Sequence, residues 1–244
     1  MEFQGKTILV TGGGSGIGLA SAQAFHNLGA KVAICGRNKT KLDKASELIS
    51  KSKERVLSLV CDAGQPKEVE NTVSSTIKAF GPIDILVHCV GMNLKERSFQ
   101  ELNPESWRSL VEGNLDSAYY VFHEVLKGMR PRKNGLVIVV NSISGLRGNP
   151  LGGPGYVAGK FGLNGLVVAT AAEESKNNIR FCSIFPGEVN TPILEARPNP
   201  VSEEHKKSIL QPEDVAQSVL FVARLPEHVV IPELIIIPSK ATYI

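Results

Sequence analysis

A glycine-rich stretch near the start of the sequence, Thr11-Gly-Gly-Gly-Ser-Gly-Ile-Gly18, constrains the possible folds more than any other segment. The short apolar run Lys6–Thr11 precedes it, and apolar residues recur at the helical period from Gly16 onward. Glycines allow the backbone to turn tightly between two such elements. The sequence therefore predicts a strand, a tight turn and a helix in direct succession.

The same alternation of apolar runs and helical periods continues along the chain. The apolar runs are continuous, as expected for strands that helices cover on both faces. Seven strands with crossover helices predict an α/β fold, a doubly wound and mostly parallel sheet, in a single domain over residues 1–244. The expected strands are Lys6–Thr11, Val32–Cys35, Val56–Val60, Ile83–Val90, Leu136–Asn141, Ile179–Phe185 and Leu234–Ile237.

Punctuating residues locate the helices between these strands. Gly81-Pro82 ends one helix, and Asn103 is the expected N-cap of another that begins at about Pro104. The region Thr191–Leu210 is rich in prolines and charges, and we expect it to be an insertion over the carboxyl edge of the sheet, where such folds bind ligands. The other expected helices start near Gly16, span about Thr40–Lys51 and Pro66–Phe80, contain Tyr156, and open at Gln211-Pro-Glu-Asp214.

Length, composition and charge exclude several classes of function. The chain has 244 residues, of which 42% are hydrophobic and 21% charged, as is ordinary for one globular α/β domain. The net charge of +3 is too small to favour a nucleic-acid partner. No apolar run approaches the roughly 18 residues of a membrane span, and Met1–Lys6 leads directly into the first strand, so we expect a cytoplasmic protein.

The cysteines show no spacing typical of a metal site. Each lies in or beside an apolar run, so we expect reduced core thiols and no bound metal. The four are Cys35, Cys61, Cys89 and Cys182.

Tyr156 and Lys160 lie four residues apart on an expected helix, so their side chains share one face. A fixed positive charge there is expected to lower the pKa of the phenol from its usual value of about 10. The tyrosine would then be usable as a proton donor and acceptor near neutral pH. The spacing alone is also compatible with a chance surface pair.

The glycine-rich turn favours a dinucleotide ligand. Its backbone can pass close to a pyrophosphate, and the following helix offers free N–H groups to it. The second strand ends in Cys35-Gly36-Arg37, with no acid to accept ribose hydroxyls but with a cation for a 2'-phosphate. NADP(H) is therefore preferred, with NAD(H) as the alternative. Asp62, at the end of the third strand, lies near the expected adenine edge or caps the following turn.

Taken together these residues identify the chain as similar to short-chain dehydrogenases/reductases of the compact type, whose motifs occur here in family order: Thr11 to Gly18, Asp62, Asn114, Ser142, Tyr156, Lys160 and Pro186 to Thr191. The resemblance implies a Rossmann-like fold and an enzyme that acts on a small carbonyl or alcohol substrate. The cofactor-binding residues that it implies are Gly12, Ser15, Gly16, Ile17, Gly18, Arg37, Asp62, Ala63, Gly91, Tyr156, Lys160, Pro186, Gly187, Val189 and Thr191.

The resemblance also implies a catalytic set. Tyr156 would give its proton to the substrate oxygen, and Ser142 would hydrogen-bond the same oxygen, with Ser144 as the competing serine. Lys160 would bind the nicotinamide ribose and tune Tyr156, while Asn114 would hold a water that relays protons. The expected substrate pocket contains Asn93, Leu94, Arg147, Leu151, Glu188, Asn190 and Leu194.

One motif departs from the family pattern. His88-Cys-Val-Gly91 stands where relatives usually have Asn-Asn-Ala-Gly, so only the glycine is retained. We interpret His88 as a core or cofactor-adjacent side chain rather than a second catalytic base. The departure leaves open a non-catalytic dinucleotide sensor or scaffold.

Two helices carry more apolar surface than one sheet face can cover. They are the helix from Pro104 and the helix that contains Tyr156. We therefore expect a homo-oligomer, a tetramer or a dimer.

Overall fold

The computed structural model describes residues 1–241 and contains a seven-stranded, all-parallel sheet, as predicted. The strands are β1 (Thr7–Thr11), β2 (Lys31–Gly36), β3 (Val56–Val60), β4 (Ile85–His88), β5 (Gly135–Val140), β6 (Ile179–Pro186) and β7 (Glu233–Ile236). Their order in the sheet is β3-β2-β1-β4-β5-β6-β7. The order reverses direction between β1 and β4, which is the switch point where doubly wound sheets bind ligands.

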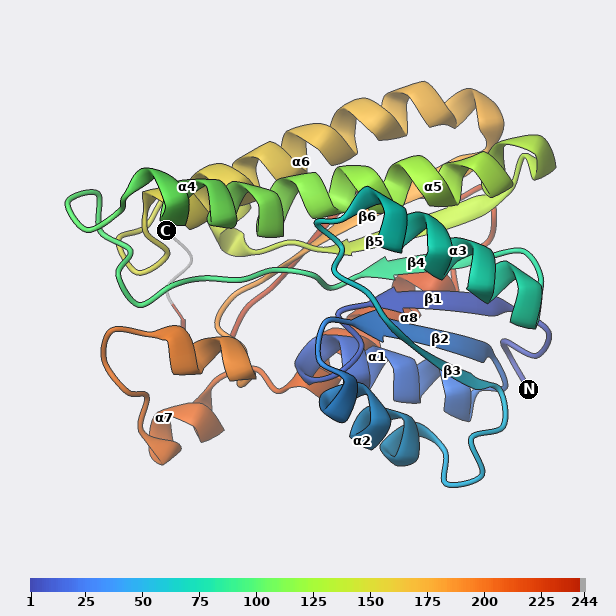
Figure 1. Cartoon of the computed structure of the whole chain (residues 1–244), viewed down its shortest axis with the longest axis horizontal. Helices are drawn as coiled ribbons and strands as arrows, with labels where there is room; N and C mark the ends of the chain where they lie inside the picture. The colour runs from blue at the N-terminus through green and yellow to red at the C-terminus, as the bar shows by residue number, and fades with distance from the viewer. Residues whose placement is uncertain (242–244) are drawn as a thin grey trace.

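Helices cover both faces of the sheet (Figure 1). On one face lie α1 (Gly16–Asn27), α2 (Lys39–Ile49) and α8 (Pro212–Ala223), and on the other lie α3 (Pro66–Phe80), α4 (Pro104–Val111), α5 (Ser117–Arg132) and α6 (Pro154–Glu174). The short α7 (Glu203–Ser208) stands away from the sheet. None of the helices in residues 1–241 is long and apolar enough to cross a membrane.

Alternate residues of each strand enter two separate cores. Ile8 and Val10 of β1 pack with Phe25 of α1, whereas Leu9 packs on the other face with Phe122 of α5 and its neighbours. Every residue of β1 is buried. Its three central residues are therefore apolar on both faces, and the hydroxyls of Thr7 and Thr11 at its ends contact the Phe80 carbonyl and the His88 ring.

Local signals place several boundaries where the sequence predicts them. The Asn103 side chain accepts a hydrogen bond from the Ser106 backbone N–H at 2.8 Å and caps α4. Gln211 donates its backbone N–H to Asp214 at 2.7 Å in the capping box of α8. In contrast, β4 is shorter than the expected Ile83–Val90, because both neighbouring strands stop pairing with it at His88.

Two segments differ from expectation. The helix expected from Pro104 is interrupted by a π-helical turn, Glu112–Asp116, between α4 and α5. The region Thr191–Leu210 is not merely loose, because it forms a 3₁₀ turn at Pro192–Ala196 and then α7. Helical periods count apolar residues and do not detect one extra residue in a turn.

Candidate active site

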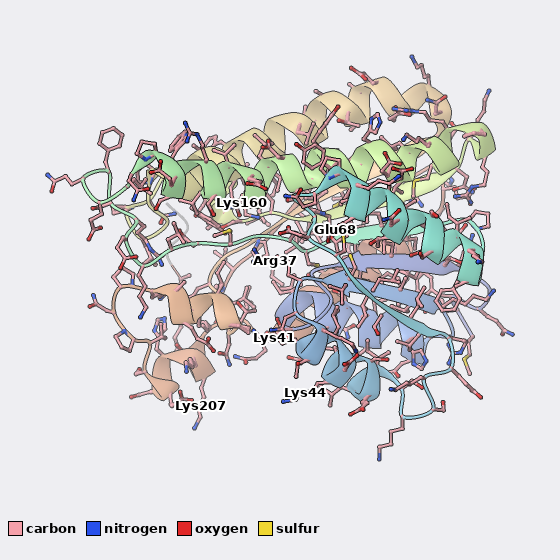
Figure 2. The ribbon with its side chains drawn as sticks, in the orientation of Figure 1. Arg37, Lys41, Lys44, Glu68, Lys160 and Lys207 are labelled. Carbon is pink, nitrogen blue, oxygen red and sulfur yellow. The ribbon has the colours of Figure 1, made fainter. Side chains whose placement is uncertain are left out.

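A cleft of about 810 Å³ opens at the carboxyl ends of the central strands. All of the residues that the resemblance implies for cofactor binding line it, from the glycine turn at one end to Tyr156 and Lys160 at the other. Figure 2 labels three of the residues that line the cleft one below the other, namely Lys160, Arg37 and Lys41. Of the implied catalytic residues, Ser142 also lines the cleft, whereas Asn114 is fully buried behind it.

The glycine turn forms one wall of the cleft. Gly12 has a φ of +70°, and a Cβ added to it would lie 2.8 Å from the Cys89 carbonyl oxygen. Ser15, the N-cap of α1, makes no side-chain capping bond, so the first N–H groups of the helix are available to an anion. Backbone approach and free donors are what a pyrophosphate requires, so these residues fit a dinucleotide.

Two cations near the tip of β2, Arg37 after the strand and Lys41 in α2, have no side-chain partner among residues 1–241. Arg37 and Lys41 are exposed, line the cleft and make no side-chain hydrogen bond or ion pair with another residue of 1–241. Lys39 instead pairs with Asp43 at 2.8 Å, and Asn38 caps α2. Arg37 and Lys41 are therefore the two side chains near this tip that are able to neutralise a phosphate.

Asp62 performs a local structural task as well as lining the cleft. Its side chain accepts a hydrogen bond from the Gly64 backbone N–H at 3.0 Å. The sequence left two interpretations of Asp62 open, a cap of the following turn and a position near the adenine. The structure contains the turn cap, and because Asp62 also lines the cleft, a position near the adenine is compatible with the structure.

Ser142 is close enough to Tyr156 for its hydroxyl to lower the pKa of the phenol, and its oxygen accepts a hydrogen bond from the Ser144 backbone N–H at 3.1 Å. The competing Ser144 is buried, and its hydroxyl accepts a hydrogen bond from the Asn149 amide at 3.0 Å. Ser142 is therefore the serine whose hydroxyl lies beside the tyrosine.

The electrostatics of the pair differ from the expectation for Tyr156. Loss of hydration raises the pKa of Tyr156, and the opposing influences are the hydroxyl of Ser142 and the charge of Arg97 rather than that of Lys160. Lys160 is itself almost completely buried, and burial lowers its pKa to about 8. Its ammonium lies 5.8 Å from the centre of the Tyr156 ring.

Asn114 lies in the π-helical turn, and its side chain is already fully bonded through its amide N–H groups. They donate to the carbonyls of Met92 and Leu110, each at 2.9 Å, and its oxygen accepts from the Met92 N–H at 3.1 Å. Asn114 thus fixes the segment that follows β4. The side-chain amide has no free N–H for the expected relay water.

A Cβ on Gly91 would lie 3.1 Å from the Lys160 ammonium and 3.2 Å from the Asn114 oxygen, which explains why glycine stands there.

His88 is a core side chain, as interpreted from the sequence. Its ring contacts the Thr11 hydroxyl at 2.9 Å and packs edge-on against Phe122. Burial lowers the pKa of His88 to about 3, with a further contribution from Lys160. The imidazole is therefore neutral at physiological pH, and it is not among the residues that line the cleft.

The substrate end of the cleft matches expectation only in part. Asn93, Leu151, Glu188 and Leu194 line it, whereas Leu94, Arg147 and Asn190 do not. Asn190 is turned away because its amide bonds Gln211 at 3.0 Å.

Sequence reasoning missed two arginines at this end, Arg97 and Arg197. Arg97 lies in a loop without periodicity, and nothing in its local sequence marks it as buried. Only the fold brings it to Tyr156, so no sequence signal could have found it.

Comparisons with known proteins agree with this geometry. The family model described as short chain dehydrogenase matches residues 6–201. The 3-oxoacyl-(acyl-carrier-protein) reductase FabG of Thermotoga maritima is 34% identical over 232 residues, covering 91% of this chain and 92% of that protein. An uncharacterized oxidoreductase of Staphylococcus saprophyticus is 30% identical over 239 residues, covering 98% of this chain and 99% of that protein.

Solved structures are similar over the whole fold. The closed form of serine dehydrogenase complexed with NADP+ has a TM-score of 0.89 at 26% identity, covering 97% of this chain and 96% of the other. A variant of actinorhodin polyketide ketoreductase with NADPH has a TM-score of 0.88 at 28% identity, covering 98% of each chain. The chain therefore belongs to the short-chain dehydrogenase family of NAD(P)-dependent, hydride-transferring oxidoreductases.

Proposed function

We propose that the protein reduces a ketone or aldehyde with NADPH, or oxidises the corresponding alcohol with NADP+. One observation carries the proposal: the neighbouring Ser142 and Tyr156 side chains line the same cleft as the glycine turn and Lys160. A proton donor and a dinucleotide cradle in one cleft are what carbonyl reduction needs.

Each side chain has a role in this scheme. The nicotinamide supplies the hydride when the cofactor is bound. Tyr156 gives its phenolic proton to the carbonyl oxygen in reduction and takes it back in oxidation, and Ser142 holds that oxygen by a hydrogen bond. Lys160 binds the nicotinamide ribose, and its buried positive charge favours the phenolate that remains after proton transfer.

Asn114 acts one step further from the reacting atoms. Its amide holds the Met92 segment in place behind the Lys160 ammonium. We assign it a positioning role in place of the relay through its side chain.

Three observations support NADP(H) over NAD(H). Arg37 and Lys41 line the cleft without a side-chain partner in the described part of the chain, and Arg37 can form a forked bond to a 2'-phosphate. No acid stands at the tip of β2. Similar solved structures contain NADP+ or NADPH.

The alternative is a non-catalytic dinucleotide sensor or scaffold. Binding alone does not require a serine hydroxyl beside a tyrosine. The altered motif before Gly91, which kept this alternative open, places a neutral core histidine at His88 without disturbing Ser142 or Tyr156. These observations favour the enzyme.

The direct test is oxidation of NADPH, followed by absorbance, with a panel of aldehydes, ketones and oxo esters. Turnover by the wild-type chain and its loss in Tyr156→Phe support the proposal. Tight NADPH binding without turnover of any panel member, in either direction, favours the sensor.

We also propose that the protein is a homo-oligomer, a tetramer or dimer that pairs α5 and α6. Apolar side chains remain exposed along α4, α5 and α6, namely Trp107, Tyr119, Phe161 and Val168. Such side chains are usually covered by another subunit. Light scattering at micromolar concentration is expected to give a multiple of the chain mass, and a monomer mass would contradict this.

A further inference from the structure

Arg97 is a buried cation beside the proposed proton donor. Only 7% of its surface is exposed, yet it lines the cleft. Its charge is one of the influences that lower the pKa of Tyr156, so the guanidinium and the phenol lie within electrostatic range. The Arg97 Cβ also packs against Gly153, three residues before Tyr156, and both side chains line one cleft, so a group bound by Arg97 would lie near the proton donor.

The partners of Arg97 among residues 1–241 include no carboxylate. Its guanidinium donates to the Leu151 carbonyl at 2.9 Å and to the Ala196 carbonyl, and its Nε has no partner. A guanidinium has five N–H groups, so these two bonds leave three without a protein acceptor. Burying a cation without a compensating anion is costly.

The neighbouring Arg197 does not have this deficit. Its guanidinium pairs with Glu188 at 2.8 Å, and the same carboxylate contacts His205 at 2.7 Å. Glu188 is the one acid among the residues that line this end of the cleft, and Arg97, Arg197 and Lys160 are the bases. The described residues therefore leave the substrate end with excess positive charge.

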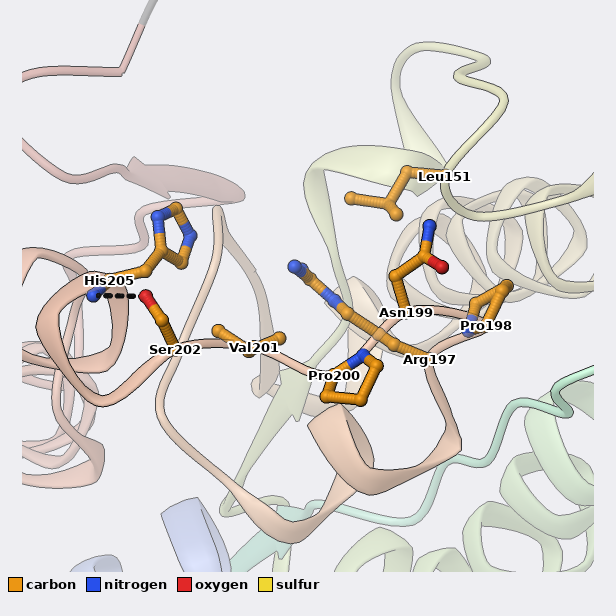
Figure 3. Close-up of a pocket in the computed structure, with 8 residues that line it drawn as sticks. All are labelled: Leu151, Arg197, Pro198, Asn199, Pro200, Val201, Ser202 and His205. Atoms are coloured by element: carbon orange, nitrogen blue, oxygen red, sulfur yellow. Dashed lines mark hydrogen bonds between the residues drawn. The ribbon is translucent and has the colours of Figure 1, made fainter.

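Beyond Arg197 the cleft is continued by a second hollow of about 440 Å³ (Figure 3). Leu151 and Arg197 border both spaces, and Figure 3 shows Arg197 extending between Leu151 and His205. The remaining lining residues of the hollow are Pro198, Asn199, Pro200, Val201, Ser202 and His205. A substrate thus has room to extend away from the reacting carbon on this side.

We propose that the substrate carries a carboxylate close to the reacting carbonyl or alcohol carbon, and that Arg97 binds it; this rests on the proposed function. A carboxylate can accept two parallel N–H bonds from a guanidinium and supplies the missing negative charge. Arg97 is then the residue that selects oxo acids or hydroxy acids over neutral carbonyl compounds.

The experiment compares acids with their own methyl esters, which keep the carbonyl and remove the charge. An α-oxo, a β-oxo and a γ-oxo acid and their esters are assayed with NADPH, using wild type, Arg97→Met and Arg97→Lys. We expect wild type to prefer at least one acid over its ester, and Arg97→Met to lower kcat/KM for that acid roughly ten- to a hundredfold more than for the ester. Arg97→Lys should retain part of the preference.

The ratio of acid to ester separates recognition from structural damage. If Arg97 only joins the Leu151 and Ala196 loops, or only tunes Tyr156, its replacement lowers both rates together and leaves the ratio unchanged. Arg180→Met is the matched control, because Arg180 is also a partly buried arginine that donates to carbonyls, those of Leu225, Pro226 and Val229. It should leave the ratio at the wild-type value.

Calorimetric binding of the hydroxy acids and hydroxy esters to the NADP+-saturated chain gives a readout that does not depend on turnover. Preferential binding of an acid that Arg97→Met abolishes supports the proposal even if no compound turns over, an outcome that would count against the proposed function alone. Equal binding of acid and ester, no binding of either, or an unchanged acid to ester ratio in Arg97→Met overturns it.

Discussion

The two ends of the cleft are built in different ways. At the dinucleotide end the wall is backbone, formed by the glycine turn and the first N–H groups of α1. At the substrate end the wall consists of loops held by bonds between distant parts of the chain, such as Arg97 to Leu151 and Asn93 to Gly152. A backbone wall depends on a few small residues, whereas a wall of loops depends on particular long side chains. Cofactor binding and substrate choice should therefore respond to different substitutions.

The largest expected effect separates chemistry from cofactor binding. Tyr156→Phe removes one hydroxyl, and proton transfer of this kind contributes typically 10²- to 10⁴-fold in rate. We expect turnover to fall by that order while NADPH affinity stays within a few fold, because the glycine turn is untouched. Steady-state kinetics and cofactor titration measure the two. Retained turnover would show that another residue donates the proton. The separation between a cofactor-binding end and a catalytic end of the cleft would then be wrong.

Lys160 serves both cofactor binding and catalysis in the proposed function. Its replacement should lower activity but raise the stability of the folded chain. Burial lowers its pKa to about 8 from about 10.4 in an unfolded chain, so at pH 7 the buried charge costs about 3 kcal/mol of folding free energy. Lys160→Met should abolish activity yet raise the free energy of unfolding at neutral pH.

The stability difference between wild type and Lys160→Met should also depend on pH. Between about pH 8 and 10.4 the unfolded state binds more protons at Lys160 than the folded state, so wild-type stability rises relative to the variant. Urea unfolding of both proteins at pH 7 and near pH 10 should show the difference shrinking. A constant difference would mean that packing, not charge, separates the two proteins.

Arg37→Ala tests the dinucleotide end alone. Removing a charge-assisted bond of about 1.5 to 3 kcal/mol should weaken NADPH use roughly ten- to a hundredfold and leave NADH nearly unchanged. Lys41, also without a side-chain partner among the described residues, would blunt the effect. Gly36→Asp should go further, since a carboxylate repels the phosphate and accepts ribose hydroxyls. Values of kcat/KM for both cofactors measure this, and equal weakening of both would remove Arg37 from cofactor selection.

The smallest effect is expected at His88. Because its pKa is about 3, the imidazole neither gains nor loses a proton between about pH 5 and 8. His88→Asn should leave turnover within a few fold and keep the shape of the pH profile. The check is kcat/KM across that range. Disappearance of an ionisation from the profile would show that His88 takes part in proton transfer.

The success of the sequence predictions follows the same division. The bounds of β3 and α3 agree with expectation, because Pro66 begins α3 and Gly81 ends it by local backbone preference. The glycine turn, Asp62, Ser142 and the Pro186–Thr191 turn follow strand ends, so they reach the cleft once the sheet order is given. Such features depend on short stretches of sequence.

What could not be predicted depends on contacts between distant segments. The burial of Arg97 follows from carbonyls in two other loops, and the pKa of Tyr156 follows from burial that no spacing encodes. The π-helical turn at Asn114 has the same period of apolar residues on either side as a regular helix. Single-sequence patterns report local preference, and these features are set by tertiary packing.

The segment between Asn190 and Leu210 begins and ends at adjacent positions in the fold. The Asn190 N–H bonds the Leu210 carbonyl at 2.8 Å, and the Leu210 N–H bonds the Glu188 carbonyl at 3.1 Å. Because its ends are already tied, changing its length alters mainly the loop-closure entropy, by about 0.6 kcal/mol for each doubling. The segment is thus an exchangeable unit. The corresponding segment of a relative could replace it between these two residues, which would change the substrate pocket while the rest of the catalytic domain folds as before.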